Sequence, residues 1–278
     1  AYRRSIQKKP LHPVFFIFIL GVCIILNLVS ALAVKPKFFL AENVPGIISC
    51  THLPEFKNIL RMFSSVGYEI TYQLLDARDY GVPQERKGVF VVGYRKSLKK
   101  RFIFPESSHL KNPTKTLEGH QKLKWLTLRD AIGDLPEPIS ALEKNNGNTH
   151  LKIPNHEYMN GSFSSIYMSR NRRRDWSEPS FTIQAGGRHA PLHPSSSLMV
   201  NVEKDLWKFK DPKPTFRRLS VREAARIQTF SDDFVFYYKN IADGYKMIGN
   251  AVPVKLAEAL ANKIKIDLKG TRKNRKQE

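Results

Sequence analysis

The segment that decides the fold is FFLAENVPGI, residues 38–47. Its first four residues are apolar without alternation, which is typical of a strand buried on both faces. Glu42 follows directly, and Pro45 closes the strand because it lacks a backbone donor. Ligands of open α/β sheets bind beyond the carboxyl ends of the strands, which makes Glu42 a candidate site residue. Taken by itself, the segment also fits an ordinary loop or helix-capping glutamate.

Regular elements continue after this strand. Residues 53–67 predict an amphipathic helix that Gly67 can close with a left-handed backbone. Strands are expected over 68–77 and 88–95, with a turn at 80–83 between them. The strand–helix–strand order predicts an α/β fold with a largely parallel sheet. The apolar face of the helix consists of Phe56, Ile59, Leu60 and Phe63.

The second half of the chain is less regular. Residues 97–216 are rich in Lys, Pro, Ser, Asn, His and Gly and show little periodicity. Regular structure resumes where Ser220 and Glu223 form an S-x-x-E capping box at the start of a helix. Gly249 and Asn250 predict a tight turn before a last helix, with Val254, Leu256, Ala257, Leu260 and Ile264 inward. The expected organisation is an apolar segment 1–34, an α/β part 35–96, an insert 97–216, a return to the α/β part 217–266, and a basic tail 267–278.

The charge balance points to a polyanionic partner. The 278 residues contain 46 Lys and Arg against 25 Asp and Glu, a net charge of +21. Such a surface attracts nucleic acid, although a solvated basic surface is the plainer alternative. The cysteines Cys23 and Cys50 show no metal-ligand spacing, so the sequence predicts neither structural zinc nor a disulfide framework. A reducing cytoplasm fits this cysteine content.

Residues 14–34 form an uncharged apolar run long enough to span a bilayer, with basic residues on both sides. Two other interpretations are a helix packed in a buried α/β layer and a segment altered by a frameshift. Taken alone, the run favours a membrane span. The family resemblance carried by the later segments implies a helix packed on the sheet at this position, and with it a decayed or frameshifted helix is preferred to a membrane anchor.

Four ordered segments resemble the DNA (cytosine-5)-methyltransferases over roughly residues 35–266: Glu42-Asn43-Val44, residues 80–95, residues 217–230 and residues 249–260. The resemblance implies a partial Rossmann-like, S-adenosylmethionine-dependent methyltransferase domain. The insert takes the place of the family's target-recognition domain, and residues 178–194 are similar to segments of that domain. The implied activity is methyl transfer from S-adenosylmethionine to C5 of cytosine in a specific double-stranded DNA site. Enzymes of this kind often belong to restriction-modification systems, which implies a cognate restriction endonuclease as partner.

The family's chemistry gives these residues their roles. A cysteine thiolate adds to C6 of a flipped-out cytosine, and an acid at N3 stabilises the charge that develops on the ring. The resemblance assigns the acid to Glu42, beside Asn43 and Val44. Arg86, in the family's Gln-x-Arg-x-Arg pattern with Gln84, would reach O2 of the cytosine. Gly88 stands where that pattern has its second arginine.

Further residues are carried over by the same resemblance. Gly249, Asn250, Ala251 and Val252 would line the S-adenosylmethionine pocket, a simple helix start being the alternative. Arg217 and Arg218 would organise the target-recognition domain, with surface charge as the alternative. The remaining candidates come from the residues themselves, because the dense basic run 169–180 suits contact with DNA phosphates and arginines and a histidine of the insert could read bases. These are Arg170, Arg172, Arg173, Arg174, Arg188 and His189.

The family's Pro-Cys nucleophile motif and Gly-rich cofactor loop do not occur in these 278 residues. We therefore expect this chain alone to be inactive, either as one subunit of a split enzyme or as a truncated remnant. Cys50 is not expected to replace the nucleophile. A hypothesis from another class is a non-enzymatic, basic DNA-binding protein attached to the membrane through residues 14–34.

Overall fold

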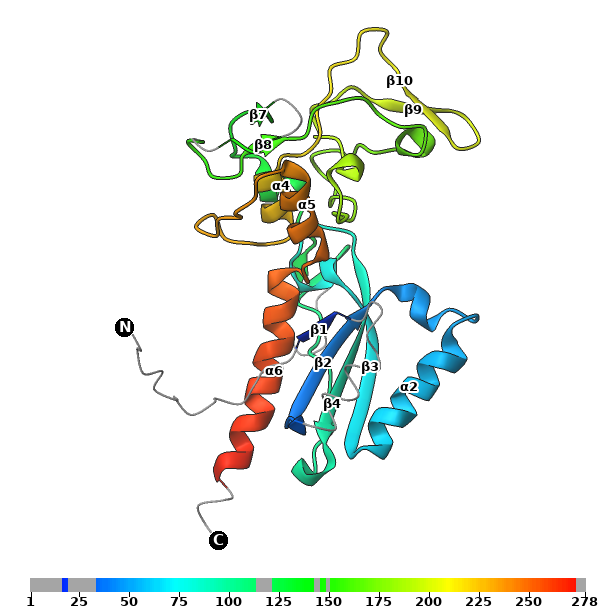
Figure 1. Ribbon diagram of the computed structural model, residues 1–278, viewed down its shortest axis with the longest axis vertical. Coiled ribbons are helices and arrows are strands. Elements are labelled where there is room, and N and C mark those ends of the chain that lie inside the picture. The colour runs from blue at the N-terminus through cyan, green and yellow to red at the C-terminus, as the bar shows by residue number, and fades with distance from the viewer. Residues whose placement is uncertain (1–16, 20–33, 114–121, 143–145, 149–150, 274–278) are drawn as a thin grey trace, which may run out of the picture. The chain divides into compact units, whose positions relative to one another are not determined.

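The computed structural model of the protein describes residues 17–19, 34–113, 122–142, 146–148 and 151–273 (Figure 1). The chain divides into two compact units. The first, here called the sheet unit, comprises residues 1–75, 87–104 and 262–278. The second, here called the loop-rich unit, comprises residues 76–86 and 105–261. These units differ from the ranges expected from sequence, because residues 217–261 group with the insert.

The sheet unit is built on a four-stranded sheet with the order β1-β2-β4-β3 (Figure 1). The strands are β1 (Ile17–Ile19), β2 (Phe38–Asn43), β3 (Tyr68–Asp76) and β4 (Lys87–Arg95). The first four residues of β2 are buried, as the unbroken apolar run predicts. β4 is buried along most of its length, so both central strands face apolar layers.

The expectation of a largely parallel sheet is wrong for the central pair. β1 is parallel to β2, but β4 runs antiparallel to β2, with Glu42 opposite Phe90. The physical reason lies in the connection from β3 to β4. It contains only the short 3-10 helix η2 (Ala77–Tyr80), and a parallel crossover needs a longer segment that usually forms an α-helix.

Helix α2 (Leu53–Ser65) packs its apolar face against the sheet. Phe56 and Phe63 are buried with Phe39 of β2, and the Phe39 and Phe63 rings lie 4.6 Å apart. Gly67 follows with a φ of 97°, which confirms the predicted left-handed glycine after this helix.

The last helix, α6 (Val254–Lys273), begins in the loop-rich unit and ends in the sheet unit. Leu256, Leu260 and Ile264 are buried as predicted, whereas Val254 is exposed. Within the sheet unit, the Tyr94 hydroxyl of β4 donates to the Asp267 carboxylate at 3.1 Å. This bond ties the carboxyl-terminal half of α6 to the central strand.

In its described residues, the loop-rich unit combines short strands with the helices α3 (Leu128–Ile132), α4 (Val221–Ile227) and α5 (Ile241–Asn250) and the start of α6. Side chains of α3, α4 and α5 form one hydrophobic cluster, which explains why residues 217–250 group with the insert. β9 (Met199–Glu203) and β10 (Leu206–Phe209) form an antiparallel hairpin. The other short elements described in the loop-rich unit are β5 (His109–Leu110), β6 (Leu123–Lys124), β7 (Ile139–Ser140), β8 (Glu157–Tyr158), and the 3-10 helices η5 (Tyr167–Ser169) and η6 (Gly187–His189). The sheet unit also contains the 3-10 helices η1 (Pro45–Ile48) and η3 (Lys96–Leu98).

Most of the apolar run 14–34 lies outside the described residues. Ile17–Ile19 form β1, so at these three positions the run is a strand and not the expected helix. Within the described part of the chain, no helix is both long and apolar enough to cross a membrane.

Candidate functional site

Glu42 occupies the position that the sequence predicts, next to last in β2 and half-buried. Its carboxylate lies against the backbone of Gly88, where an added Cβ would come within 3.1 Å of Glu42 Oε1. A larger side chain at position 88 would therefore press on this carboxylate. Asn43 ends the strand, and its Oδ1 accepts a hydrogen bond from the Val44 backbone at 2.8 Å. Val44 itself is 65% exposed.

Gln84 and Arg86 belong to the loop-rich unit, where residues 83–85 run beside residues 180–183. The Ser180 backbone donates to the Pro83 carbonyl at 2.9 Å, and the Glu85 backbone donates to the Ser180 carbonyl at 2.8 Å. Gln84 is fully buried, and its Oε1 accepts from the Ile183 backbone at 3.0 Å. The Gln-x-Arg segment is thus held by the part of the insert that resembles a target-recognition segment.

Gly249 joins the same neighbourhood. Arg86 Nη1 donates to the Gly249 carbonyl at 2.9 Å. An added Cβ on Gly249 would lie 2.4 Å from the backbone of Gln184 and Ala185, so only glycine allows this approach. The structure corrects the expected turn, because Gly249 and Asn250 are the last residues of α5. Asn250 is exposed, while Ala251 and Val252 are half-buried in the link to α6.

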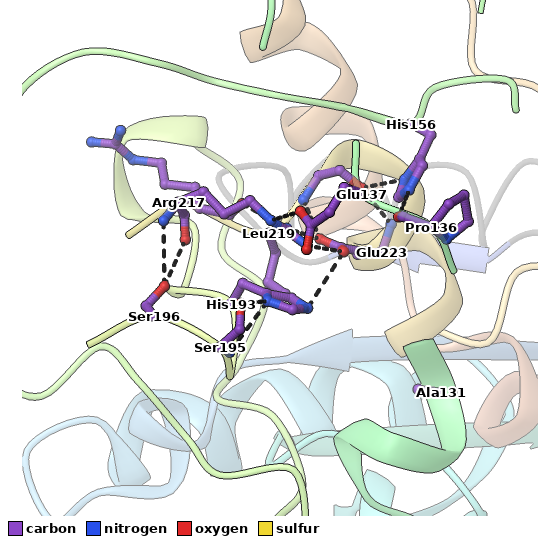
Figure 2. A network of polar contacts seen from close by, with 12 residues as sticks. Ala131, Pro136, Glu137, His156, His193, Ser195, Ser196, Arg217, Leu219 and Glu223 are labelled. Atoms are coloured by element: carbon purple, nitrogen blue, oxygen red, sulfur yellow. Dashed lines mark hydrogen bonds and ion pairs between the residues drawn. The ribbon is translucent and has the colours of Figure 1, made fainter. Parts of the chain in front are cut away.

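Arg217 is at the centre of a polar network and is not a free surface charge (Figure 2). Its Nη1 and Nη2 donate to the two Glu223 carboxylate oxygens at 2.8 and 2.9 Å, and its Nε donates to Glu137 at 2.9 Å. Glu223 is 1% exposed and also accepts from the Ser220 backbone at the start of α4. Burial lowers the pKa of Arg217, but the two carboxylates outweigh it and raise the pKa overall. The network ties the insert to α4.

His193 is a member of this network that the sequence analysis missed (Figure 2). It is 4% exposed, its Nε2 lies 3.7 Å from Glu223, and its Nδ1 lies 2.6 Å from the Ser195 hydroxyl. Burial lowers the pKa of His193 to about 4, because Glu223 only partly compensates for lost hydration. His193 is therefore neutral near pH 7. No pattern around His193 in the sequence marks it, because its partners are distant in the chain.

Arg218 is buried and holds the loop that precedes η5. Its guanidinium donates to the carbonyls of Met159, Gly161 and Ser162 at 3.2 to 3.4 Å. It also lies over the Phe163 ring, 4.6 Å from the centroid. These contacts support an organising role within the insert rather than a phosphate contact.

Three of the six candidate DNA-contacting residues make extensive contacts within the unit. Arg172 is 7% exposed and donates to the Tyr167 and Ile166 carbonyls at 2.7 and 3.1 Å. Arg173 donates to the Pro194 and Ser196 carbonyls at 3.1 and 2.8 Å. Arg174 pairs with Glu85 and Glu178, both at 2.8 Å. Each of these three side chains thus donates hydrogen bonds or forms ion pairs within the loop-rich unit.

The other three candidates are Arg170, Arg188 and His189. Arg170 and Arg188 are exposed, and His189 is half-buried. Arg170 and His189 line a pocket of about 140 Å³, here called the arginine pocket. No Asp or Glu contributes to its described lining, so a group that accepts hydrogen bonds suits it. Its lining residues are Arg170, Asn171, Arg172, Phe181, Thr182, Gln184, His189 and Pro191.

The chain is similar to curated DNA methyltransferases. It is 61% identical over 238 residues to the type II methyltransferase M.MthTI of Methanothermobacter thermautotrophicus, covering 84% of this chain and 68% of that protein. It is 44% identical to M.FnuDI of Fusobacterium nucleatum, covering 88% and 69%. Against M.BsuRI of Bacillus subtilis the identity is 42%, and the chain spans about half of that protein, 51%.

Two solved structures share the fold. A protein assigned as a DNA modification methyltransferase, encoded within an E. coli prophage, superposes with a TM-score of 0.56 at 21% identity, covering 86% of this chain and 72% of that chain. The Entamoeba histolytica methyltransferase EhMeth gives a TM-score of 0.50 at 15% identity, covering 84% and 63%. At these identities the likeness shows the fold alone, a partial Rossmann-like methyltransferase fold. Residues 25–266 match the model of the C-5 cytosine-specific DNA methylase family, and the chain belongs to that family.

Proposed function

We propose that this chain is the cytosine-holding and DNA-reading portion of a type II DNA (cytosine-5)-methyltransferase. The observation that carries the proposal is the bond from Arg86 to the Gly249 carbonyl, together with the tight approach of Gly249 to residues 184–185. Three segments far apart in the sequence meet there, and each resembles a motif of the family. The reaction is methyl transfer to C5 of cytosine in a specific double-stranded site.

In this proposal Glu42 acts on the flipped-out cytosine. Its carboxyl group donates a proton or hydrogen bond to N3, which stabilises the negative charge that nucleophilic addition at C6 places on the ring. The position of Glu42 at the end of a buried strand supports this role, because the strand fixes the carboxylate while leaving it half-exposed. Arg86 supplies the second stabilising charge, at O2.

S-adenosylmethionine, as cofactor, supplies the methyl group. The residues assigned to it fit one wall of its pocket, since Asn250 offers an exposed amide and Ala251 and Val252 offer small half-buried apolar surfaces. Gly249 supports this wall, because its backbone is packed against residues 184–185. The Pro-Cys nucleophile and the Gly-rich loop would come from a segment outside these 278 residues, on the same or another chain.

Double-stranded DNA is the proposed partner of the basic surface. Arg170 and Arg188 are proposed contacts because their side chains are exposed, and His189 is proposed because it lines the arginine pocket with Arg170. Arg172, Arg173 and Arg174 act indirectly, each through the segment that its side chain holds. The type II methyltransferase names of the curated relatives support a place in a restriction-modification system. A cognate restriction endonuclease as partner and a location in the bacterial cytoplasm are further parts of the proposal.

The test combines the chain with the part of M.MthTI outside the aligned 238 residues, which would carry the missing motifs. We expect the mixture to transfer tritiated methyl groups to double-stranded DNA and the chain alone to transfer none. Glu42→Gln should lower the rate by about a hundredfold or more and leave DNA binding nearly unchanged.

Two other results would change the proposal. An unchanged rate in Glu42→Gln would show that Glu42 does not act at N3. DNA binding without any transfer in the mixture would favour the non-enzymatic DNA-binding alternative. Carbonate washing would then decide whether that protein is attached to a membrane, because only a spanning segment resists the wash.

A further inference from the structure

Tyr167 lies behind the arginine pocket and contacts two of its walls. The ring is fully buried in η5 and stacks on Phe163, with centroids 4.5 Å apart and planes 6° apart. It belongs to a small apolar cluster with Leu192 and Met199. The side chain does not line the pocket, so any effect on a ligand has to pass through its neighbours.

The first pocket wall, residues 170–172, is fastened to Tyr167 through Arg172. The Arg172 guanidinium lies 4.7 Å from the centroid of the Tyr167 ring, and its Nε donates to the Tyr167 carbonyl at 2.7 Å. Its Nη2 donates to the Ile166 carbonyl at 3.1 Å. This closes residues 166–172 into a loop that presents Arg170 and Asn171 to the pocket.

The second pocket wall, residues 189–191, is fastened by the Tyr167 hydroxyl. That hydroxyl donates to the Ala190 carbonyl at 2.9 Å, between the pocket residues His189 and Pro191. Burial raises the pKa of Tyr167, and the nearby Arg218 and Arg172 only partly oppose it, so the hydroxyl stays a donor near neutral pH. One side chain therefore links both walls.

We propose that Tyr167 is a positioning residue that sets the separation of the two walls of the arginine pocket and thereby the sequence specificity of DNA binding. This inference rests on the proposed function, because it requires the pocket to read DNA. Base readout depends on hydrogen-bond geometry, whereas phosphate attraction tolerates small displacements. A shift of one wall should therefore weaken specific binding and spare non-specific binding.

The test uses the full chain and the substitution Tyr167→Phe, which keeps the ring and its stacking but removes the hydroxyl. The matched control is Tyr80→Phe, since Tyr80 is also a buried tyrosine of the loop-rich unit, with its hydroxyl bonded to the Pro105 carbonyl at 2.9 Å. Double-stranded DNA with a randomised core is first selected on the wild-type chain. Dissociation constants are then measured for the selected and a scrambled duplex at several salt concentrations.

We expect Tyr167→Phe to lower the ratio of specific to non-specific affinity by about tenfold. Affinity for the scrambled duplex and its salt slope should stay within about twofold of wild type, and Tyr80→Phe should change neither quantity. Phe163→Leu, which removes the stacking partner of Tyr167, should lower the ratio in the same direction if Tyr167→Phe does not fold. The inference is overturned if the ratio of specific to non-specific affinity is unchanged in Tyr167→Phe. It is also overturned if Tyr80→Phe lowers this ratio as much as Tyr167→Phe does.

Failure of the proposed function would look different. If the wild-type chain selected no sequence at all, DNA reading by this chain would be wrong, and the role of Tyr167 would fall with it. That result appears before any variant is made, so the two failures are distinguishable.

Discussion

Gly249 has no space for a side chain. Its substitution tests the contact among Gly249, Arg86 and residues 184–185. A Cβ at this position would lie 2.4 Å from backbone atoms of residues 184–185, so Gly249→Ala must displace main chain. We expect a loss of about 1–3 kcal/mol in the free energy of unfolding, measured by denaturant titration. Gly46→Ala is the control, because a Cβ there meets no atom within 4 Å. Equal stability of the two variants would contradict the packing described.

His193 should make stability depend on pH. Its pKa is about 4 in the folded chain against 6.5 for a free histidine. Between these two pH values the histidine is protonated in the unfolded chain but neutral in the folded chain. Neutral His193 therefore contributes about 3 kcal/mol to the free energy of unfolding. This contribution is complete above pH 6.5 and is lost as the pH falls through about 4. Unfolding free energies of wild type and His193→Asn across this range should converge toward low pH. His52→Asn, at an exposed histidine, should parallel wild type, and a parallel His193→Asn curve would refute the assignment.

At the scale of elements, α4 depends on its capping box. The Ser220 hydroxyl accepts from the Glu223 backbone at 3.0 Å and also contacts His156 Nδ1 at 3.0 Å, and Ser220 is fully buried. Ser220→Ala should therefore cost about 2 kcal/mol, at the upper end for a helix cap. Thr127→Ala, at the partly exposed capping box of α3, should cost about 1 kcal/mol or less. Thermal unfolding of both variants checks the order, and the reverse order would contradict it.

At the scale of the whole molecule, a net charge of +21 should make DNA affinity strongly dependent on salt. Arg188→Gln removes an exposed charge, so it should reduce the slope of log affinity against log salt by about 0.9 if Arg188 contacts a phosphate. Arg173→Gln instead breaks bonds to the Pro194 and Ser196 carbonyls, and it should lower the melting temperature. Titrations of scrambled double-stranded DNA and melting curves check both. A melting temperature lowered equally by both substitutions would contradict the distinction.

Local patterns in the sequence predicted β2, α2, the capping box of α4 and the interior face of most of α6. These features depend on neighbours within a few residues, where periodicity and capping chemistry act directly. The resemblance to the DNA (cytosine-5)-methyltransferases likewise needed only the order of four short segments, and the family match confirms it. The catalytic role of Glu42 stays a prediction, although its place at the end of β2 agrees with the sequence.

The tertiary structure decided which charged side chains are accessible and in which direction β4 runs. Arg170, Arg172 and Arg173 look alike in the sequence, yet only Arg170 is exposed, because the carbonyls that bind the other two come from the folded loops. Strand direction depends on the whole connection, and the low pKa of His193 depends on burial by distant residues. The sequence by itself determined the family and the local elements, because both depend on residues that are close together in the sequence. The packing of the folded loops decided which of the arginines stay exposed.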